Sequence, residues 1–147
     1  MRADWLAALR LYLLTMTGGN LLWEIAQLPL YTIWTAETLG GKVFAVAHCT
    51  AGDVLIGLFS IAVALVVAGD RDWPTRRFRP VFLLTLLLGI SYTAFSEWLN
   101  IAIRRSWEYS DRMPVITLLN FELGLSPLLQ WLLVPSLAFW LIRRLRP

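Results

Sequence analysis

Four long apolar stretches constrain this chain more than any other feature, because about 20 apolar residues in a helix cross the core of a bilayer. The stretches cover about residues 6–34, 42–69, 81–103 and 127–143. Charged residues make up only 16% of the chain, whereas a soluble domain carries about 25%. The sequence therefore predicts an all-α polytopic membrane protein in which residues 1–147 form one domain, a bundle of four transmembrane helices.

A polar tract over residues 104–124 separates the third apolar stretch from the last. It is too polar to span a membrane, and its Trp107 and Tyr109 are typical of the aromatic belt at a membrane surface. We therefore expect an outer loop that contains a short re-entrant or interfacial segment before the last helix. Within that helix, Pro135 predicts a kink, because proline removes one helical hydrogen bond.

The basic residues predict how the chain is oriented in the membrane. If both termini face the cytoplasm, 9 of the 13 lysines and arginines fall inside, where Lys and Arg are usually enriched. The inner residues are Arg2, Arg10, Arg71, Arg76, Arg77, Arg79, Arg143, Arg144 and Arg146, and the outer ones are Lys42, Arg104, Arg105 and Arg112. The first stretch lacks a small-residue cleavage site after a short apolar core, so we expect an uncleaved helix rather than a signal peptide.

Ionisable residues interrupt three of the apolar stretches. Glu24 lies in the first, Glu97 in the third, and His48 and Asp53 in the second. Such a side chain costs roughly 2.5–3.5 kcal/mol within a bilayer, and it usually faces a partner or a wet cavity. In the expected orientation all four residues fall in the outer half of the membrane. The sequence therefore predicts that they share one site.

Helical spacing places further polar residues beside these groups. Two stretches carry polar residues at the spacing i, i+4, i+7, i+11, which is one face of a helix. These residues are Asn20, Glu24, Gln27 and Tyr31 in the first stretch, and Thr93, Glu97, Asn100 and Arg104 in the third. In a bundle such faces turn inward, away from lipid. The matching faces also suggest a duplicated two-helix unit.

These residues define the candidate site. His48, Glu24, Glu97 and Asp53 are the candidate catalytic groups, as donors or acceptors of a proton. The candidate ligand-binding residues are Asn20, Gln27, Tyr31, Trp98, Asn100, Arg104, Arg105, Trp107, Tyr109 and Asp111. Among them, the arginines could hold a phosphate or carboxylate head group, and the tryptophans could flank a ligand or stabilise a cation.

Structural explanations for the same residues remain open. Glu24 and Glu97 could be protonated acids hydrogen-bonded to a neighbouring helix, and Glu97 could pair with Arg104. The outer arginines could instead pair with Glu108 and Asp111. Cys49 fits a small packing residue, because a buried apolar setting disfavours the thiolate, although a nucleophile assisted by Asp53 can be drawn. The Glu-x-x-His pattern of di-iron bundles is absent, so we expect no metal.

Four motifs resemble those of known proteins. They are Glu24-x-x-Gln27-Leu28-Pro29, His48-Cys49-Thr50-Ala51-Gly52-Asp53, Phe95-Ser96-Glu97-Trp98-Leu99-Asn100 and Trp107-x-Tyr109-Ser110-Asp111-Arg112-Met113-Pro114. In these motifs the chain resembles a family of small bacterial inner-membrane proteins of unassigned function. The resemblance implies a multi-pass protein of the bacterial inner membrane, which agrees with the cytoplasmic termini expected from the charges.

Parts of the same motifs also resemble the sterol isomerase and sigma-2 receptor superfamily. These parts are Glu24-x-x-Gln27-Leu28-Pro29, His48-x-Thr50, and Trp107-Glu108-Tyr109 with Asp111-Arg112. Proteins of that superfamily are bundles of four or five helices around a ligand cavity, where a histidine and acids move a proton on a lipid double bond and a tryptophan faces the carbocation. The resemblance implies that His48 and either Glu24 or Glu97 are acid/base groups.

Three functions follow from these expectations. The first is a site for a lipid-like or isoprenoid-like molecule, reached from the outer leaflet, that binds its ligand with or without acid/base catalysis. The second is a small proton-coupled transporter, and the third is an accessory subunit of a homo-oligomer or larger membrane complex. The expected partners are membrane lipid and a small hydrophobic or amphipathic ligand. Nucleic acid is not expected, because the net charge of +3 is modest and the arginines gather at the ends of the apolar stretches.

Overall fold

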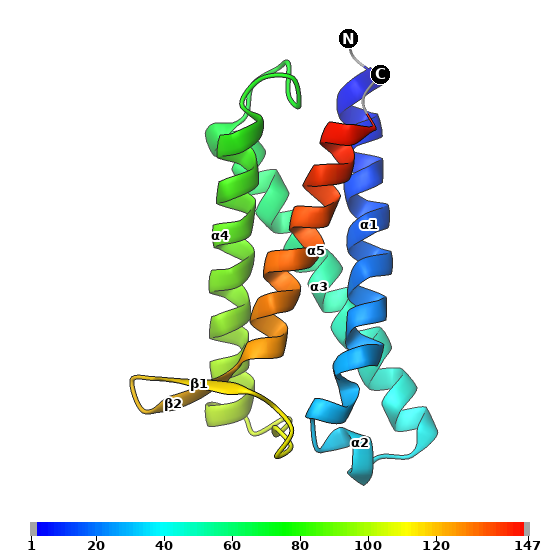
Figure 1. Cartoon of the computed structure of the whole chain (residues 1–147), viewed down its shortest axis with the longest axis vertical. Helices are drawn as coiled ribbons and strands as arrows, with labels where there is room; N and C mark the ends of the chain where they lie inside the picture. The colour runs from blue at the N-terminus through cyan, green and yellow to red at the C-terminus, as the bar shows by residue number, and fades with distance from the viewer. Residues whose placement is uncertain (1–2, 146–147) are drawn as a thin grey trace.

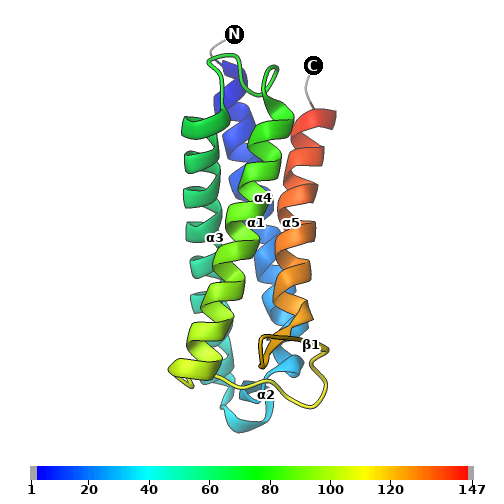
Figure 2. The same ribbon diagram turned by 90° about the vertical axis from the view of Figure 1, so that its left-hand side faces the viewer.

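The computed structural model describes residues 3–145 and is mostly helical. Arg2 and Arg146, which the predicted orientation also used, lie outside these residues. The four long helices are α1 (Ala3–Gln27), α3 (Leu39–Ala68), α4 (Phe78–Glu97) and α5 (Leu125–Arg144). They lie side by side along one long axis (Figures 1 and 2). The start of α1, the end of α5 and the α3–α4 connection share one end of the molecule, and the remaining short elements lie at the other (Figure 1).

Three of these helices are long and apolar enough to cross a membrane. They are α3, α4 together with its continuation η2 (Trp98–Ile103), and α5. The prediction of an all-α chain is confirmed, and three helices of spanning length and composition fit a membrane protein, whereas four spans stay a prediction. Helix α1 falls short by the same measure among the described residues. Arg10, Asn20, Glu24 and Gln27 interrupt its apolar character, and each of them lowers its mean hydropathy.

The first helix ends earlier than the sequence analysis expected. It stops at Gln27 rather than near residue 34, and a single 3₁₀ turn, η1 (Leu28–Leu30), follows it. Pro29 lies in that turn, and proline lacks the amide hydrogen that would continue an α-helix. A short helix α2 (Ile33–Ala36) then leads to Thr38, whose hydroxyl accepts a hydrogen bond from the Gly41 amide and caps α3.

The segment expected to be re-entrant or interfacial contains a β-hairpin instead of a helix. Strand β1 (Val115–Leu118) pairs antiparallel with β2 (Phe121–Gly124). The turn residues Leu119 and Asn120 have φ angles of 48° and 64°, as a type I′ turn requires. The β-branched residues of β1 favour a strand. The hairpin projects sideways from the helices beside the lower end of α4 (Figure 1).

The apolar core occupies the half of the molecule away from the hairpin. Its largest fully buried side chains include Trp131, Tyr12, Phe139 and Met16. The Tyr12 hydroxyl donates a hydrogen bond to the Gly57 carbonyl oxygen at 3.1 Å, which ties α1 to α3. Large apolar side chains are also exposed on the outer faces of all four long helices, for example Leu22, Val66, Leu87 and Leu133. Such a surface is unusual for a soluble protein and suits contact with lipid.

Candidate functional site

A cavity of about 370 Å³ lies between the helices in the half that carries the hairpin. Its size falls within the usual range of ligand sites, about 300–1,000 Å³. The residues around it come from α1, α3, α4 and α5 and from η1, η2 and the following loop. Polar groups therefore gather at one end of helices that are otherwise apolar.

Most of the predicted site residues surround this cavity. All four candidate catalytic groups line it, together with five of the candidate ligand-binding residues. The lining residues from the prediction are Glu24, His48, Asp53, Glu97, Gln27, Tyr31, Asn100, Arg104 and Trp107. The three acids and the histidine thus line one cavity. Their chemical roles stay predictions.

Five predicted ligand-binding residues do not line the cavity. Asn20 is buried behind it, and Tyr109 reaches it only through Glu97. Trp98 follows Glu97 by one position, which turns its side chain about 100° away around the helix, and it packs against Phe95 with ring centroids 5.9 Å apart. The remaining two, Arg105 and Asp111, are exposed.

Gln130 joins the acids of two helices to α5. Its Nε2 lies 3.1 Å from Glu24 Oε1, 2.8 Å from Asp53 Oδ2 and 3.0 Å from Asn20 Oδ1. Gln130 is only 2% exposed. The sequence analysis missed it, although Ser126 and Gln130 are four residues apart and form a short polar face on the last helix.

A chain of hydrogen bonds runs from Trp23 to Glu24. The Trp23 indole donates to Ser126 Oγ at 3.1 Å, and Ser126 Oγ donates to Gln27 Oε1 at 2.8 Å. Gln27 Nε2 then donates to Glu24 Oε1 at 2.7 Å and to Gln130 Oε1 at 3.3 Å. Every donor in the chain points toward the carboxyl groups, so the network fixes the two amides in one orientation.

Glu97 is held by two tyrosines from outside α4. The Tyr109 hydroxyl donates to Glu97 Oε2 at 2.6 Å, and the Tyr31 hydroxyl donates to the same oxygen at 3.4 Å. The Gly124 amide donates to the Tyr109 hydroxyl oxygen at 2.9 Å. Burial, and then the nearby Glu97 carboxyl, raises the pKa of the Tyr109 phenol above its usual range. The phenol therefore remains a neutral donor at physiological pH.

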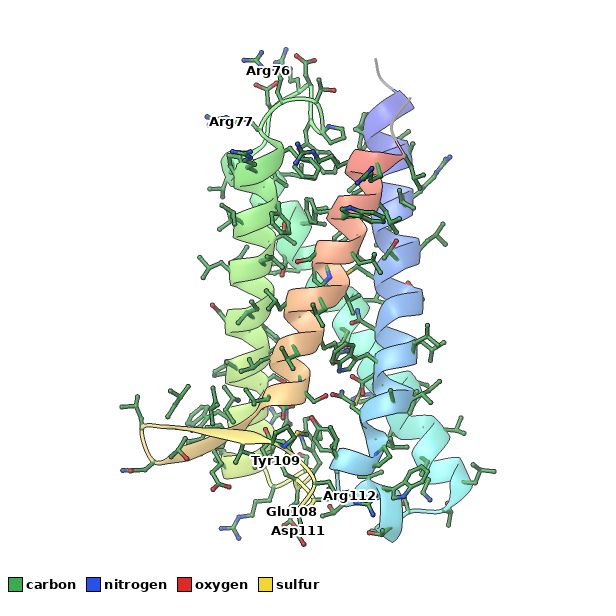
Figure 3. All side chains as sticks on the ribbon, in the orientation of Figure 1. Arg76, Arg77, Glu108, Tyr109, Asp111 and Arg112 are labelled. Carbon is green, nitrogen blue, oxygen red and sulfur yellow. The ribbon has the colours of Figure 1, made fainter. Side chains whose placement is uncertain are left out.

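The loop that carries Tyr109 is fastened across the end of the cavity. Tyr31 and Tyr109 form an isolated antiparallel bridge. The Thr32 amide donates to the Glu108 carbonyl at 3.0 Å, and the Ser110 amide donates to the Leu30 carbonyl at 2.9 Å. Glu108, Tyr109, Asp111 and Arg112 lie together at this end, opposite Arg76 and Arg77 (Figure 3).

Thr93 carries a buried hydroxyl that faces the cavity without a partner. The residue is 6% exposed and lines the cavity, and its Oγ1 has no hydrogen-bond partner within the described structure. A helical threonine commonly donates to the carbonyl four residues earlier, as Thr85 does to Val81 at 2.8 Å. A buried hydroxyl without a partner is costly, and Thr93 bears this cost beside the cavity.

The ion pairs considered as structural alternatives for the charged residues are not seen among the described residues. Within residues 3–145, the ion pair that the structure contains joins Arg76 and Asp72 at 3.9 Å. Glu97 therefore bonds the hydroxyls of two tyrosines and, within the described structure, forms no ion pair with Arg104. Arg104 follows the last residue of η2 and is exposed. The outer arginines likewise form no pair with Glu108 or Asp111 in this part of the chain.

The remaining candidates lie at the rim. His48 is exposed and stacks on Phe44, with ring centroids 5.7 Å apart and planes 16° apart. Cys49 is half-buried and free. Among the described residues, no cluster of three or more His, Cys, Asp or Glu side chains could hold a metal ion. The side chains around the cavity thus include carboxyls, amides and hydroxyls as well as the His48 imidazole and the Cys49 thiol.

The fold and the site together define a mostly helical membrane protein with a polar cavity near one end of its apolar helices. No protein-family model, curated protein or solved structure matches the chain.

Proposed function

We propose that this protein binds an amphipathic, lipid-like molecule in the cavity, with the polar end of the ligand among the buried carboxyl, amide and hydroxyl groups. The observation that carries the proposal is the mixed lining of the cavity. Apolar side chains such as Leu28, Leu55 and Ile56 share the lining with Glu24, Asp53 and Glu97. A ligand with one polar and one apolar end satisfies both kinds of surface.

The proposal includes a fourth membrane span and a fixed orientation. Helix α1 contacts both α3 and α5, and Leu14, Leu22 and Ile25 on it are exposed. Contact with lipid on that side accounts for these residues. With both termini in the cytoplasm of a bacterial cell, the cavity opens in the outer half of the inner membrane, and lipid reaches it from the outer leaflet.

Transport of protons through the protein has less support. A path to the other end would pass the apolar core, where Tyr12, Met16, Trp131 and Phe139 are almost completely buried. The site therefore resembles a pocket with one opening more than a channel. Whether the protein also acts as an accessory subunit stays a prediction.

The matched glycines Gly52 and Gly18 test ligand binding. Both lie inside helices, and a Cβ added to either would meet nothing within 4 Å. Gly52 lines the cavity, whereas Gly18 is exposed on α1. The wild-type protein and the variants Gly52→Leu and Gly18→Leu are purified in mild detergent, and the small molecules bound to each are measured by mass spectrometry.

We expect a lipid-like molecule to remain with the wild-type protein and with Gly18→Leu, and to be lost from Gly52→Leu, because the leucine side chain fills the cavity. Circular dichroism and thermal melting show whether the variants are folded. Equal amounts of the same molecule in all three proteins, or none in the wild-type protein, would contradict the proposal.

A further inference from the structure

We infer that Glu24 and Asp53 form a pair of carboxyl groups that share a single proton, and that Gln130 is the positioning residue that holds them together. The inference rests on the proposed function, because both acids line the same cavity. It goes further by naming a proton-binding site within that cavity. The pair joins α1 to α3, and Gln130 reaches it from α5.

The geometry brings the two carboxyl groups together. Glu24 Oε1 and Asp53 Oδ2 lie 3.1 and 2.8 Å from the same nitrogen, Gln130 Nε2. Because both oxygens lie within hydrogen-bonding distance of that one nitrogen, the two carboxyl groups are neighbours. An ionised carboxylate can only accept hydrogen bonds. Two such groups can therefore bond to each other only when one of them carries a proton.

The count of donors at Gln130 leads to the same conclusion. An amide nitrogen has two hydrogens, but Nε2 lies within bonding distance of three acceptors, including Asn20 Oδ1 at 3.0 Å. One acceptor therefore needs another donor. A proton on the pair supplies it, because the protonated acid donates to its neighbour.

The hydrogen bonds also indicate which acid carries the proton. Glu24 Oε1 accepts from two amide nitrogens, Gln27 at 2.7 Å and Gln130 at 3.1 Å. Asp53 accepts from Gln130 through one oxygen only. Glu24 is thus the carboxylate, and Asp53 holds the proton that it donates to Glu24.

Among the described side chains, no cation is paired with either acid in a way that would replace the proton. Within the described structure, neither acid takes part in an ion pair. The other titratable or charged groups around the cavity are Tyr92 and Glu97 from α4, His48 and Cys49 from α3, Tyr31 after η1, and Arg104 after η2. Helix α5 contributes the neutral Gln130 to the lining. Two ionised carboxylates beside the same amide nitrogen would repel each other strongly in a surrounding of low dielectric constant.

Infrared spectroscopy of the full-length protein in lipid vesicles tests the shared proton. A protonated carboxyl group has a C=O stretching band distinct from that of a carboxylate, and exchange into D₂O shifts it. We expect such a band in the wild-type protein at neutral pH. The band should shift or disappear in Asp53→Asn and also in Glu24→Gln, because each variant removes one of the two carboxyl groups that hold the proton.

The control variants are Glu97→Gln, which removes the third acid of the cavity, and Glu37→Gln, which changes an exposed acid. Both should keep the band. Gln130→Leu should keep it at a shifted frequency, because the amide donor is gone while the carboxyl pair remains. An unshifted band in Gln130→Leu would overturn the positioning role of Gln130.

Three results would overturn the shared proton: no band in the wild-type protein, a band that is unchanged in either Asp53→Asn or Glu24→Gln, or a band that is lost in Glu97→Gln. If a variant does not fold, the Glu97→Gln protein gives a second test. The intensity of its band should correspond to one protonated carboxyl group per chain, because Glu24 and Asp53 share one proton. The measurement needs no ligand, so its failure is distinguishable from a failure of the mass spectrometry experiment above.

Discussion

Gln130 shows why an uncharged side chain can be the centre of a site made of acids. An amide both donates and accepts, so Gln130 gives hydrogen bonds to Glu24 and Asp53 while it accepts one from Gln27. A hydrophobic residue at this position would leave the two carboxyl groups without this donor in a buried setting, which costs about 1–3 kcal/mol for each group.

Tyr109 should make the stability of the folded protein fall at alkaline pH. Its phenol is neutral when bonded to Glu97, and its raised pKa lies above the unfolded value of about 10. The stability that Tyr109 contributes is therefore fully present below about pH 10. It is lost as the pH rises toward the pKa of the phenol in the folded protein, because the unfolded chain then releases a proton that the folded chain retains. We expect the thermal midpoint of the wild-type protein to fall over this range.

The variant Tyr109→Phe isolates the effect. It lacks the hydroxyl that bonds Glu97 and the Gly124 amide, so it should be less stable by about 1–3 kcal/mol at neutral pH, and its midpoint should fall less steeply above pH 10. Tyr92→Phe, at an exposed tyrosine, is the control and should behave as the wild-type protein does. The same steep fall in Tyr109→Phe would assign the pH dependence to other groups.

At the scale of elements, the end of α4 adapts to carry the site. Asn100 Nδ2 donates to the Ser96 carbonyl at 2.9 Å, so the side chain occupies a carbonyl that an α-helix would use. The helix continues as the wider π-helical turn η2, and the Arg104 amide bonds Leu99, five residues earlier. Turns of this kind are common at functional sites, and here Glu97 and Asn100 both still face the cavity.

The hairpin exposes an apolar tip that the membrane surface would cover. Leu119 is fully exposed and has a positive φ angle, which disfavours a side chain with a Cβ. Leu118 beside it is 53% exposed. The hairpin extends sideways from the helices (Figure 1), so in a membrane crossed along the helix axes it lies roughly parallel to the bilayer. We expect Leu119 to insert into the outer interface.

Spin labelling measures that insertion. A nitroxide is attached to Leu119→Cys in a background without Cys49, and its collisions with oxygen and with a water-soluble nickel complex are compared in vesicles. The label at residue 119 should favour oxygen, as should a label at the exposed apolar Leu83 on α4. A label at the exposed loop residue Asp111 should favour nickel. Preference for nickel at residue 119 would place the hairpin in water.

The sequence was sufficient to predict three of the long helices and the inward position of two acids, because apolar length and helical spacing are local properties of the chain. Apolar stretches of spanning length predicted α3, α4 and α5, and helical spacing placed Glu24 and Glu97 on inward faces. The hairpin was missed because Leu119 is an unusual residue for a tight turn. Gln130 was missed because its partners are more than 70 residues away, and the direction of a side chain across three helices depends on packing.

At the scale of the whole molecule, polarity divides the protein into two halves. One half holds the apolar core around Trp131 and Phe139, and the other holds the cavity and the loop that covers it. Arginines cluster at the end beside the core, where Figure 3 shows Arg76 and Arg77. The proposed orientation, with the core toward the cytoplasm, agrees with the usual excess of basic residues inside and would place the cavity in the outer half of the membrane.

Cysteine labelling tests this arrangement and the fourth span together. Single cysteines replace Trp5, Glu37, Arg76 and Arg112, which are exposed and lie near the two ends of the long helices, in a background without Cys49. A membrane-impermeant maleimide added to intact cells should label residues 37 and 112. Residues 5 and 76 should react only after the membrane is permeabilised, because α1, α3 and α4 each cross once. Labelling of both residue 5 and residue 37 from outside would show that α1 does not span. Labelling of residues 5 and 76 but not of residues 37 and 112 would reverse the orientation and place the cavity on the cytoplasmic side.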